Sequence, residues 1–263
     1  MAINLNSDPY FDDFDGAKNF HQILFKPGVA VQARELTQLQ SILRDQIAKF
    51  GNHIFKHGSV VIPGNSYADL AVPFVKVEST YGGTALNLSL YEGKVFVGAT
   101  SGVEAYIKKT LAEEGADPIT FYLAYTKGSG ENIKFVDGEE IFAKENFAIR
   151  ATVKPTASTG AGSMAFVNAG VYYVNGTFVY TPAQSIVISK YDSLPSCSVL
   201  FRIVEEIIDA DQDQTLLDPA QGSYNYAAPG ADRVQITLVL TTLGLNQPIN
   251  ADFVELMRYN QGN

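Results

Sequence analysis

Residues 171–180, which read VYYVNGTFVY, decide the fold expected for this chain. Two runs of β-branched and aromatic residues flank Asn175 and Gly176. The Asn-Gly pair favours a two-residue type I′ turn, because both central positions of that turn require a positive φ. A turn of this type joins neighbouring antiparallel strands. The stretch therefore predicts a tight β-hairpin, and similar strand patterns occur on both sides of it.

Short β-like runs with glycine-bearing turns precede the hairpin. Residues 86–111 and 119–153 alternate apolar and polar positions and are rich in β-branched and aromatic side chains, which is typical of antiparallel strands. Segments 81–83 and 154–163, at the two ends of this region, have the composition of flexible connections. We expect residues 81–153 to form an inserted small β subdomain, either a barrel or a sandwich.

The chain is therefore expected to be α+β and mainly antiparallel β, in three parts. Residues 1–80 are predicted to supply an N-terminal arm, a helix and the first strands of a core domain. Residues 81–153 form the insert. Residues 154–263 complete the core domain and include a long loop at 216–233.

One amphipathic helix is predicted within residues 32–50. Its leucines recur at steps of three and four, at positions Leu36, Leu39 and Leu43, and Gly51 is placed to end the helix. The spacing also suits a short coiled-coil seam. Two interpretations stay open: the stripe packs on the protein's own sheet, or it contacts a neighbouring subunit.

The loop at residues 216–233 reads LLDPAQGSYNYAAPGADR, which is neither polar enough for a linker nor apolar enough for a core. Low charge and abundant aromatic residues are typical of large protein interfaces. Tyr224 and Tyr226 offer rigid, amphipathic contact area. We expect the loop to be packed, either on its own domain or against a partner.

The last residues, 250–263, are predicted to form a short helix that begins at an N-cap, Asn250. The segment ends in polar residues with no closing element of secondary structure. We therefore expect the natural chain to continue past Asn263.

Composition and charge argue against several classes of function. The chain has 263 residues, a formal net charge of −9 and a charged fraction of 18%. The negative charge disfavours binding to nucleic acid, and no long apolar run predicts a membrane span. The single cysteine, Cys197, excludes an internal disulfide framework and indicates assembly in a reducing compartment.

No stretch of the sequence assembles an active site. His53 and His57 have the i, i+4 spacing of two zinc ligands, but the glutamate that follows the first histidine in a zinc peptidase is absent. Asp209, Asp211 and Asp213 have the alternate spacing of a calcium loop but lack its glycine and its closing acid. We predict no catalytic, metal or cofactor site, and no enzymatic activity.

Three stretches resemble a known family. They are YFDDFDGAKNFHQILFKPGVAVQARELTQLQSIL at residues 10–43, GVYYVNGTFV at 170–179, and the loop at 216–233. Together they resemble tailed-bacteriophage virion proteins, of myovirus and cyanophage type, that carry a domain of unknown function, DUF4815. The resemblance implies a structural virion protein of the phage tail, at the baseplate or the tail-fibre attachment. It further implies no catalysis, no cofactor, and assembly in the infected bacterial cytoplasm.

The resemblance also implies that the protein works by oligomeric assembly and anchoring. Copies of the chain would form a homotrimer and contact other tail and baseplate proteins. The expected subunit-interface residues are Arg34, Glu35, Leu36, Leu39, Leu43, Tyr224 and Tyr226. The alternative function is a carbohydrate-binding or adhesin module for host-surface recognition, in which Tyr and Phe rings stack on sugars, although the absence of Trp disfavours it.

Overall fold

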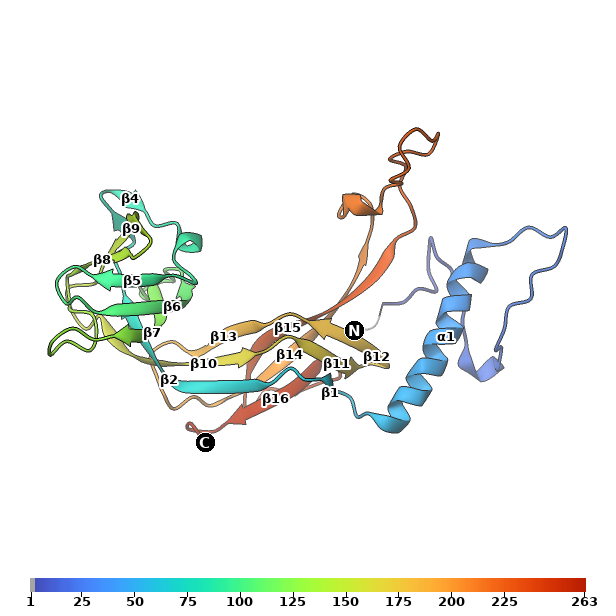
Figure 1. Ribbon diagram of the computed structural model, residues 1–263. Coiled ribbons are helices and arrows are strands. Elements are labelled where there is room, and N and C mark those ends of the chain that lie inside the picture. Colours follow the sequence, from blue (N-terminus) through green and yellow to red (C-terminus); the bar gives the residue numbers. More distant parts are fainter. Residues whose placement is uncertain (1–2) are drawn as a thin grey trace. The chain divides into compact units, whose positions relative to one another are not determined.

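The computed structural model describes residues 3–263 and divides them into two compact units. Unit 1 contains the described residues up to Ser66 together with Phe166–Gln184 and Ser198–Arg258. Unit 2 contains Tyr67–Ala165, Ser185–Cys197 and Tyr259–Asn263. The described chain is mainly antiparallel β with one α-helix, so the predicted α+β class is confirmed (Figure 1).

Unit 1 is built from an arm, one helix and two three-stranded sheets. The sheets have the strand orders β1-β11-β12 and β15-β14-β16. Its elements are η1 (Gly16–Lys18), α1 (Ala33–Ile54), β1 (Ser59–Ile62), β11 (Gly170–Val174), β12 (Thr177–Thr181), β14 (Cys197–Ile208), η3 (Gln214–Leu216), β15 (Arg233–Gly244) and β16 (Phe253–Tyr259).

The predicted hairpin is formed by β11 and β12. Asn175 and Gly176 have φ values of 48° and 77°, as a type I′ turn requires. Successive residues of a strand point to opposite faces of its sheet. Tyr172 accordingly packs edge to face on Phe201 of β14, with ring centroids 5.0 Å apart, whereas Tyr173 lies against α1. The hairpin sheet thus lies between the helix and the second sheet.

Helix α1 continues past Gly51 to Ile54, so the predicted helix end at Gly51 is wrong. A Cβ atom at Gly51 would lie 2.5 Å from the hydroxyl oxygen of Tyr173. The single proton of that hydroxyl is shared between the carbonyl of Ala48, at 3.0 Å, and the side-chain oxygen of Asn52, at 2.9 Å. The glycine is needed for this close approach of helix and sheet, rather than for a turn.

The predicted C-terminal helix is also wrong, because these residues form the strand β16. Asn250 accepts a hydrogen bond from the backbone N–H of Asp252 at 3.0 Å, within a turn that precedes the strand. Val254 of β16 is buried, and the strand pairs with β14. The neighbouring strand edge therefore overrides a weak local preference for helix.

Unit 2 is built around one eight-stranded sheet with the order β13-β10-β2-β7-β6-β5-β8-β9. Its elements are β2 (Ser66–Lys76), β3 (Thr80–Tyr81), β4 (Thr84–Ala85), η2 (Leu88–Leu90), β5 (Val95–Gly98), β6 (Glu104–Leu111), β7 (Thr120–Lys127), β8 (Glu140–Ala143), β9 (Asn146–Thr152), β10 (Thr159–Val167) and β13 (Gln184–Ser189).

The sheet of unit 2 curls on itself around an apolar core. A single antiparallel bridge between Val77 and Val153 joins the ends of β2 and β9, and the strands do not form a closed barrel. Of the two architectures predicted for the insert, a barrel or a sandwich, the barrel is therefore wrong. The core contains Phe96, Phe121 and Ile141, all fully buried.

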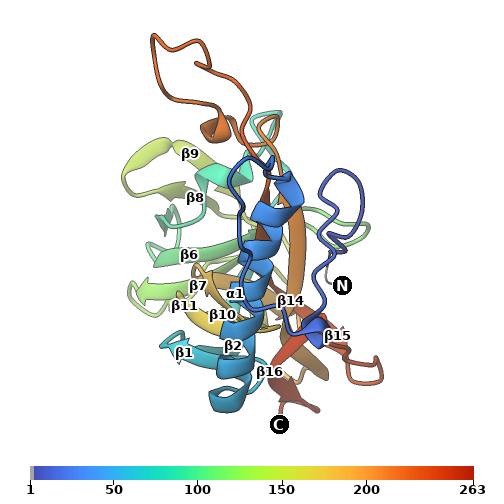
Figure 2. The same cartoon turned by 90° about the vertical axis from the view of Figure 1, so that its right-hand side faces the viewer.

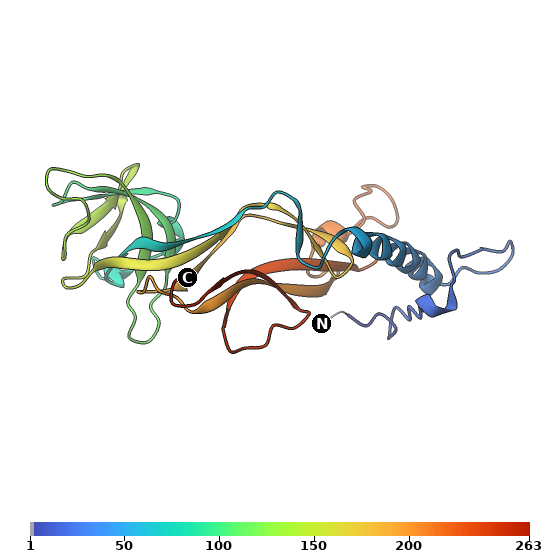
Figure 3. The ribbon, with the colours of Figure 1, turned by 90° about the horizontal axis from the view of Figure 1, so that it is seen from below.

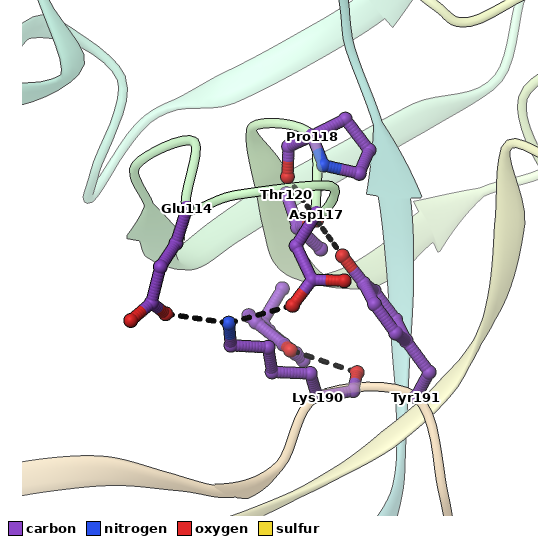
Figure 4. Close-up of polar contacts among 7 residues, drawn as sticks. Glu114, Asp117, Pro118, Thr120, Lys190 and Tyr191 are labelled. Atoms are coloured by element: carbon purple, nitrogen blue, oxygen red, sulfur yellow. Dashed lines mark hydrogen bonds and ion pairs between the residues drawn. The ribbon is translucent and has the colours of Figure 1, made fainter.

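A polar cluster fastens the segment after β13 to the rest of unit 2 (Figure 4). The Lys190 ammonium donates to carboxylate oxygens of Asp117 and Glu114, each at 2.7 Å. These hydrogen bonds raise the pKa of Lys190 above its usual range. The Tyr122 hydroxyl donates to the Lys190 carbonyl at 2.8 Å, and the hydroxyls of Tyr191 and Thr120 lie 3.0 Å apart.

The buried carboxylate of Glu139 organises one end of unit 2. It accepts from the backbone N–H groups of Thr100, Ser101 and Val136 at 3.1, 2.8 and 2.7 Å. It also accepts from the Ser101 hydroxyl at 2.9 Å. All four groups are donors, so the charged carboxylate matches them where an amide would not.

We expect Glu139→Gln to destabilise unit 2 by about 2–3 kcal/mol, because the amide NH₂ faces donors and leaves buried groups unpaired. The effect is measured by chemical denaturation, with unfolding of unit 2 monitored by hydrogen exchange. Glu113→Gln is the matched control, because that side chain is exposed. Equal stability of the two variants would contradict this account of Glu139.

We expect Gly51→Ala to lower the free energy of unfolding by about 1–2 kcal/mol. The value combines a cost of overpacking against Tyr173 with a gain of roughly 1 kcal/mol in helix propensity. The control is Gly244→Ala, where an added Cβ meets no atom within 4 Å. A Gly51→Ala protein more stable than wild type in a denaturant titration would show that the close contact is unimportant.

Candidate assembly surface

The arm holds α1 by its polar face. Asp12 is buried, and its carboxylate accepts hydrogen bonds from the Ser41 hydroxyl and from the backbone N–H of Phe14. Asp13 accepts from the Gln38 amide at 3.0 Å. The arm runs alongside α1 and returns in a loop to the start of the helix (Figures 1 and 3). Its acidic residues therefore lie against the polar side of α1.

Two of the residues predicted to contact a neighbour have partners at the start of the helix. The Glu35 carboxylate accepts from the backbone N–H of Gln32 at 2.9 Å, which caps the first turn. The Arg34 guanidinium donates to the Gln32 side-chain oxygen at 2.6 Å and lies 3.5 Å from the Asp13 carboxylate. Both charged groups thus have partners within the chain.

The apolar side of α1 is turned outward. Six side chains on it are between 38% and 69% exposed, and we call them the apolar face of α1: Leu36, Leu39, Leu43, Ile47, Phe50 and Ile54. Leu36 and Ile54 are 18 positions apart, which is five turns of an α-helix, so the six residues form a straight row. The interpretation that this stripe packs on the protein's own sheet does not match the structure, in which Ala48, Gly51 and Asn52 contact Tyr173 of the sheet. The buried apolar residue of α1 is Ile42, which lies outside this row.

The arm adds further exposed apolar residues beside the start of the helix. In the segment between η1 and α1 these are Phe20, Leu24, Phe25, Val29 and Val31. An exposed set of this size is unusual for a soluble monomer, because contiguous apolar patches mark sites of interaction. The exposed residues of arm and helix are therefore a candidate surface for assembly.

The loop at residues 216–233 is folded on itself and extends away from β14 and β15 (Figure 2). Asp218 donates its backbone N–H to Ala228 and accepts from Ala227, both at 2.9 Å. Tyr224 is fully exposed and Tyr226 is half exposed. The tip of the loop, around Tyr224, is not packed on its own domain. No contact among the described residues joins these tyrosines to α1.

The histidine and aspartate patterns do not converge. His53 lies in α1 and His57 beyond its end, where the His57 ring accepts a long hydrogen bond of 3.4 Å from the backbone N–H of Asn175. Asp209 accepts from two backbone N–H groups of its own turn. Within residues 3–263, no three His, Cys, Asp or Glu side chains are grouped to hold a metal ion.

The single cysteine, Cys197, is partly buried. Burial raises the pKa of its thiol, which disfavours the reactive thiolate form. None of the helices in the described part of the chain has both the length and the apolar character needed to cross a bilayer.

The predicted interface residues omit part of the surface that the structure exposes. Ile47, Phe50 and Ile54 extend the row of leucines by three more turns. The apolar period of 3.6 residues continues through Gly51, and this was the signal that could have identified Ile54. The exposed apolar arm residues had no periodic signal, because an arm without regular structure has no repeating face.

Comparison with known proteins gives one family and no individual relative. No curated protein and no solved structure matches the chain significantly. A family model, described as a domain of unknown function (DUF4815), matches residues 8–81 and 149–263. These ranges contain the arm, α1 and both sheets of unit 1. The match covers most of the sequence, and the chain therefore belongs to the DUF4815 family.

Proposed function

We propose that this chain is a structural protein of a phage tail, placed at the baseplate or the tail-fibre attachment, that acts by oligomeric assembly. The observation that carries the proposal is the outward apolar face of α1. Ile42 and Gly51 are the buried residues of α1, whereas the six residues of the apolar face remain available for another chain. The protein would be assembled in the infected bacterial cytoplasm and reside in the virion.

Burial of the apolar face favours association. Each of its six side chains is roughly half exposed, so burial of the remainder contributes about 1 kcal/mol per side chain or more. Association of rigid bodies costs several kcal/mol in lost freedom. A seam between helices of two or three copies offsets that cost only when most of the row takes part.

The assignment to a phage tail is supported by the resemblance of residues 10–43, 170–179 and 216–233 to virion proteins. The same resemblance favours a trimer, since tail organelles have threefold and sixfold symmetry. Antibody labelling of purified particles of the phage that encodes the chain tests this part. Label on the tail supports the proposal, and label absent from intact particles and from isolated tails would reject it.

We expect the purified wild-type chain to have an oligomeric mass, and Leu36→Asp with Leu43→Asp to give a folded monomer. Both leucines are more than half exposed in the single chain, so the substitutions remove contacts between chains rather than within one. Light scattering coupled to size exclusion measures the mass, and circular dichroism verifies folding.

The matched control places the same charges on unit 2, as Ile133→Asp with Phe147→Asp, where both residues are also exposed. This variant is expected to keep the wild-type mass. A wild-type monomer at high concentration, or a double leucine variant that stays oligomeric, would reject the role of α1 in assembly.

A further inference from the structure

A groove of about 850 Å³ lies in unit 1, along the flank of α1 beside its apolar face. Three elements form its walls: the polar side of α1, the strand β12, and the start of β15. Residues Leu5 and Tyr10 of the arm lie at its rim. The side chains that α1 contributes are Thr37, Gln40, Ser41 and Arg44.

One wall of the groove is an open strand edge. β12 is the last strand of its sheet. Because Val174 and Thr177 close a two-residue turn, they form a hydrogen-bonded pair, and bonded pairs alternate along the ladder. The backbone N–H and C=O groups of Phe178 and Tyr180 therefore point away from β11. No hydrogen bond among the described residues engages them.

The facing strand, β15, is also at the edge of its sheet, and part of this edge is covered. The Gln184 amide donates to the carbonyl of Leu238 at 2.7 Å and accepts from the N–H of Leu240 at 2.9 Å. These bonds show which backbone groups of β15 point outward. By alternation, those of Val234 and Ile236 point outward too, and both residues line the groove.

The charged groups of the groove favour an acidic occupant. Arg44 and Arg233 line it, and neither forms an ion pair with a carboxylate in the described part of the chain. Arg233 donates only to the backbone carbonyls of Ala231 and Asp232. The Asp232 carboxylate accepts a hydrogen bond from the Tyr10 hydroxyl. Two guanidinium groups are thus available to a ligand.

The arm shows which chemistry this side of α1 accepts. Asp12 and Asp13 of the same chain, in an extended segment, already bind Ser41, Gln38 and Arg34. The free guanidinium of Arg44 lies about one helical turn beyond Ser41. A second acidic segment would extend the same pattern along the helix.

We propose that this groove binds an extended acidic peptide segment of another protein, which adds a strand to β12. Its backbone would bond to the outward groups of Phe178 and Tyr180. Alternate side chains of a strand point to opposite sides, so one set would face Arg44 and the other would face Val234 and Ile236. The groove therefore selects alternating acidic and apolar residues.

The probe is a fluorescent eight-residue peptide that alternates valine and aspartate, compared with the same peptide carrying lysine for aspartate. Fluorescence anisotropy is expected to show at least tenfold tighter binding of the aspartate peptide to the wild-type protein. In the Arg44→Glu variant, the ratio of the two affinities is expected to fall at least tenfold. Lys49→Glu is the control, because this cation of α1 pairs with Asp45 and does not line the groove.

The strand-addition geometry has its own test. Tyr180→Pro removes a backbone N–H that points away from β11 and forms no hydrogen bond with it. Proline is tolerated at such edge positions. Tyr180→Ala removes the same side chain and keeps the N–H. We expect the proline variant to bind at least fivefold more weakly than the alanine variant. Peptide binding is also expected to slow hydrogen exchange at Phe178 and Tyr180.

Several outcomes would overturn the proposal. They are no binding of the aspartate peptide at millimolar concentration, equal binding of both peptides, or equal affinities of the Tyr180 variants. Conversion of a wild-type oligomer to a monomer by Arg44→Glu, without peptide binding, would assign the groove to a second copy instead. The apolar face of α1 is unchanged in all these variants, so a failure here leaves the test of assembly independent.

Discussion

The close approach of Gly51 to the ring of Tyr173 determines how unit 1 presents its surfaces. The Tyr173 hydroxyl binds α1 at two points, and no side chain at position 51 separates helix and sheet. Since the two neighbouring tyrosines of β11 point to opposite faces, the same strand holds the helix on one side and the second sheet on the other. The orientation of α1 follows from this packing.

Once α1 is fixed in this way, its two sides acquire different roles. The small and polar side contacts the sheet and the acidic arm, and it forms one wall of the groove beside β12. The apolar side is left to solvent in the single chain. This is the reverse of an ordinary surface helix, whose apolar side covers the core. The proposed assembly and the proposed peptide site therefore use different residues of one helix.

Local patterns were sufficient for some elements and insufficient for others. The type I′ hairpin at Asn175-Gly176 was predictable because its turn chemistry lies within four residues. The predicted helix end at Gly51 is wrong, because the position requires glycine for the close approach of Tyr173, 122 positions away in sequence. The predicted C-terminal helix is wrong for a similar reason, since β14, the strand that pairs with β16, lies more than 40 residues earlier.

The sequence by itself determined that a helix with a straight apolar row exists and that most of the chain pairs as antiparallel strands, because both follow from short-range periodicity. Only the tertiary structure decided that this row faces outward. The orientation of the row depends on Tyr173 and on the aspartates of the arm, because all of them form hydrogen bonds with polar groups of α1. The groove likewise arises from two strand edges, of β12 and β15, that no local pattern relates.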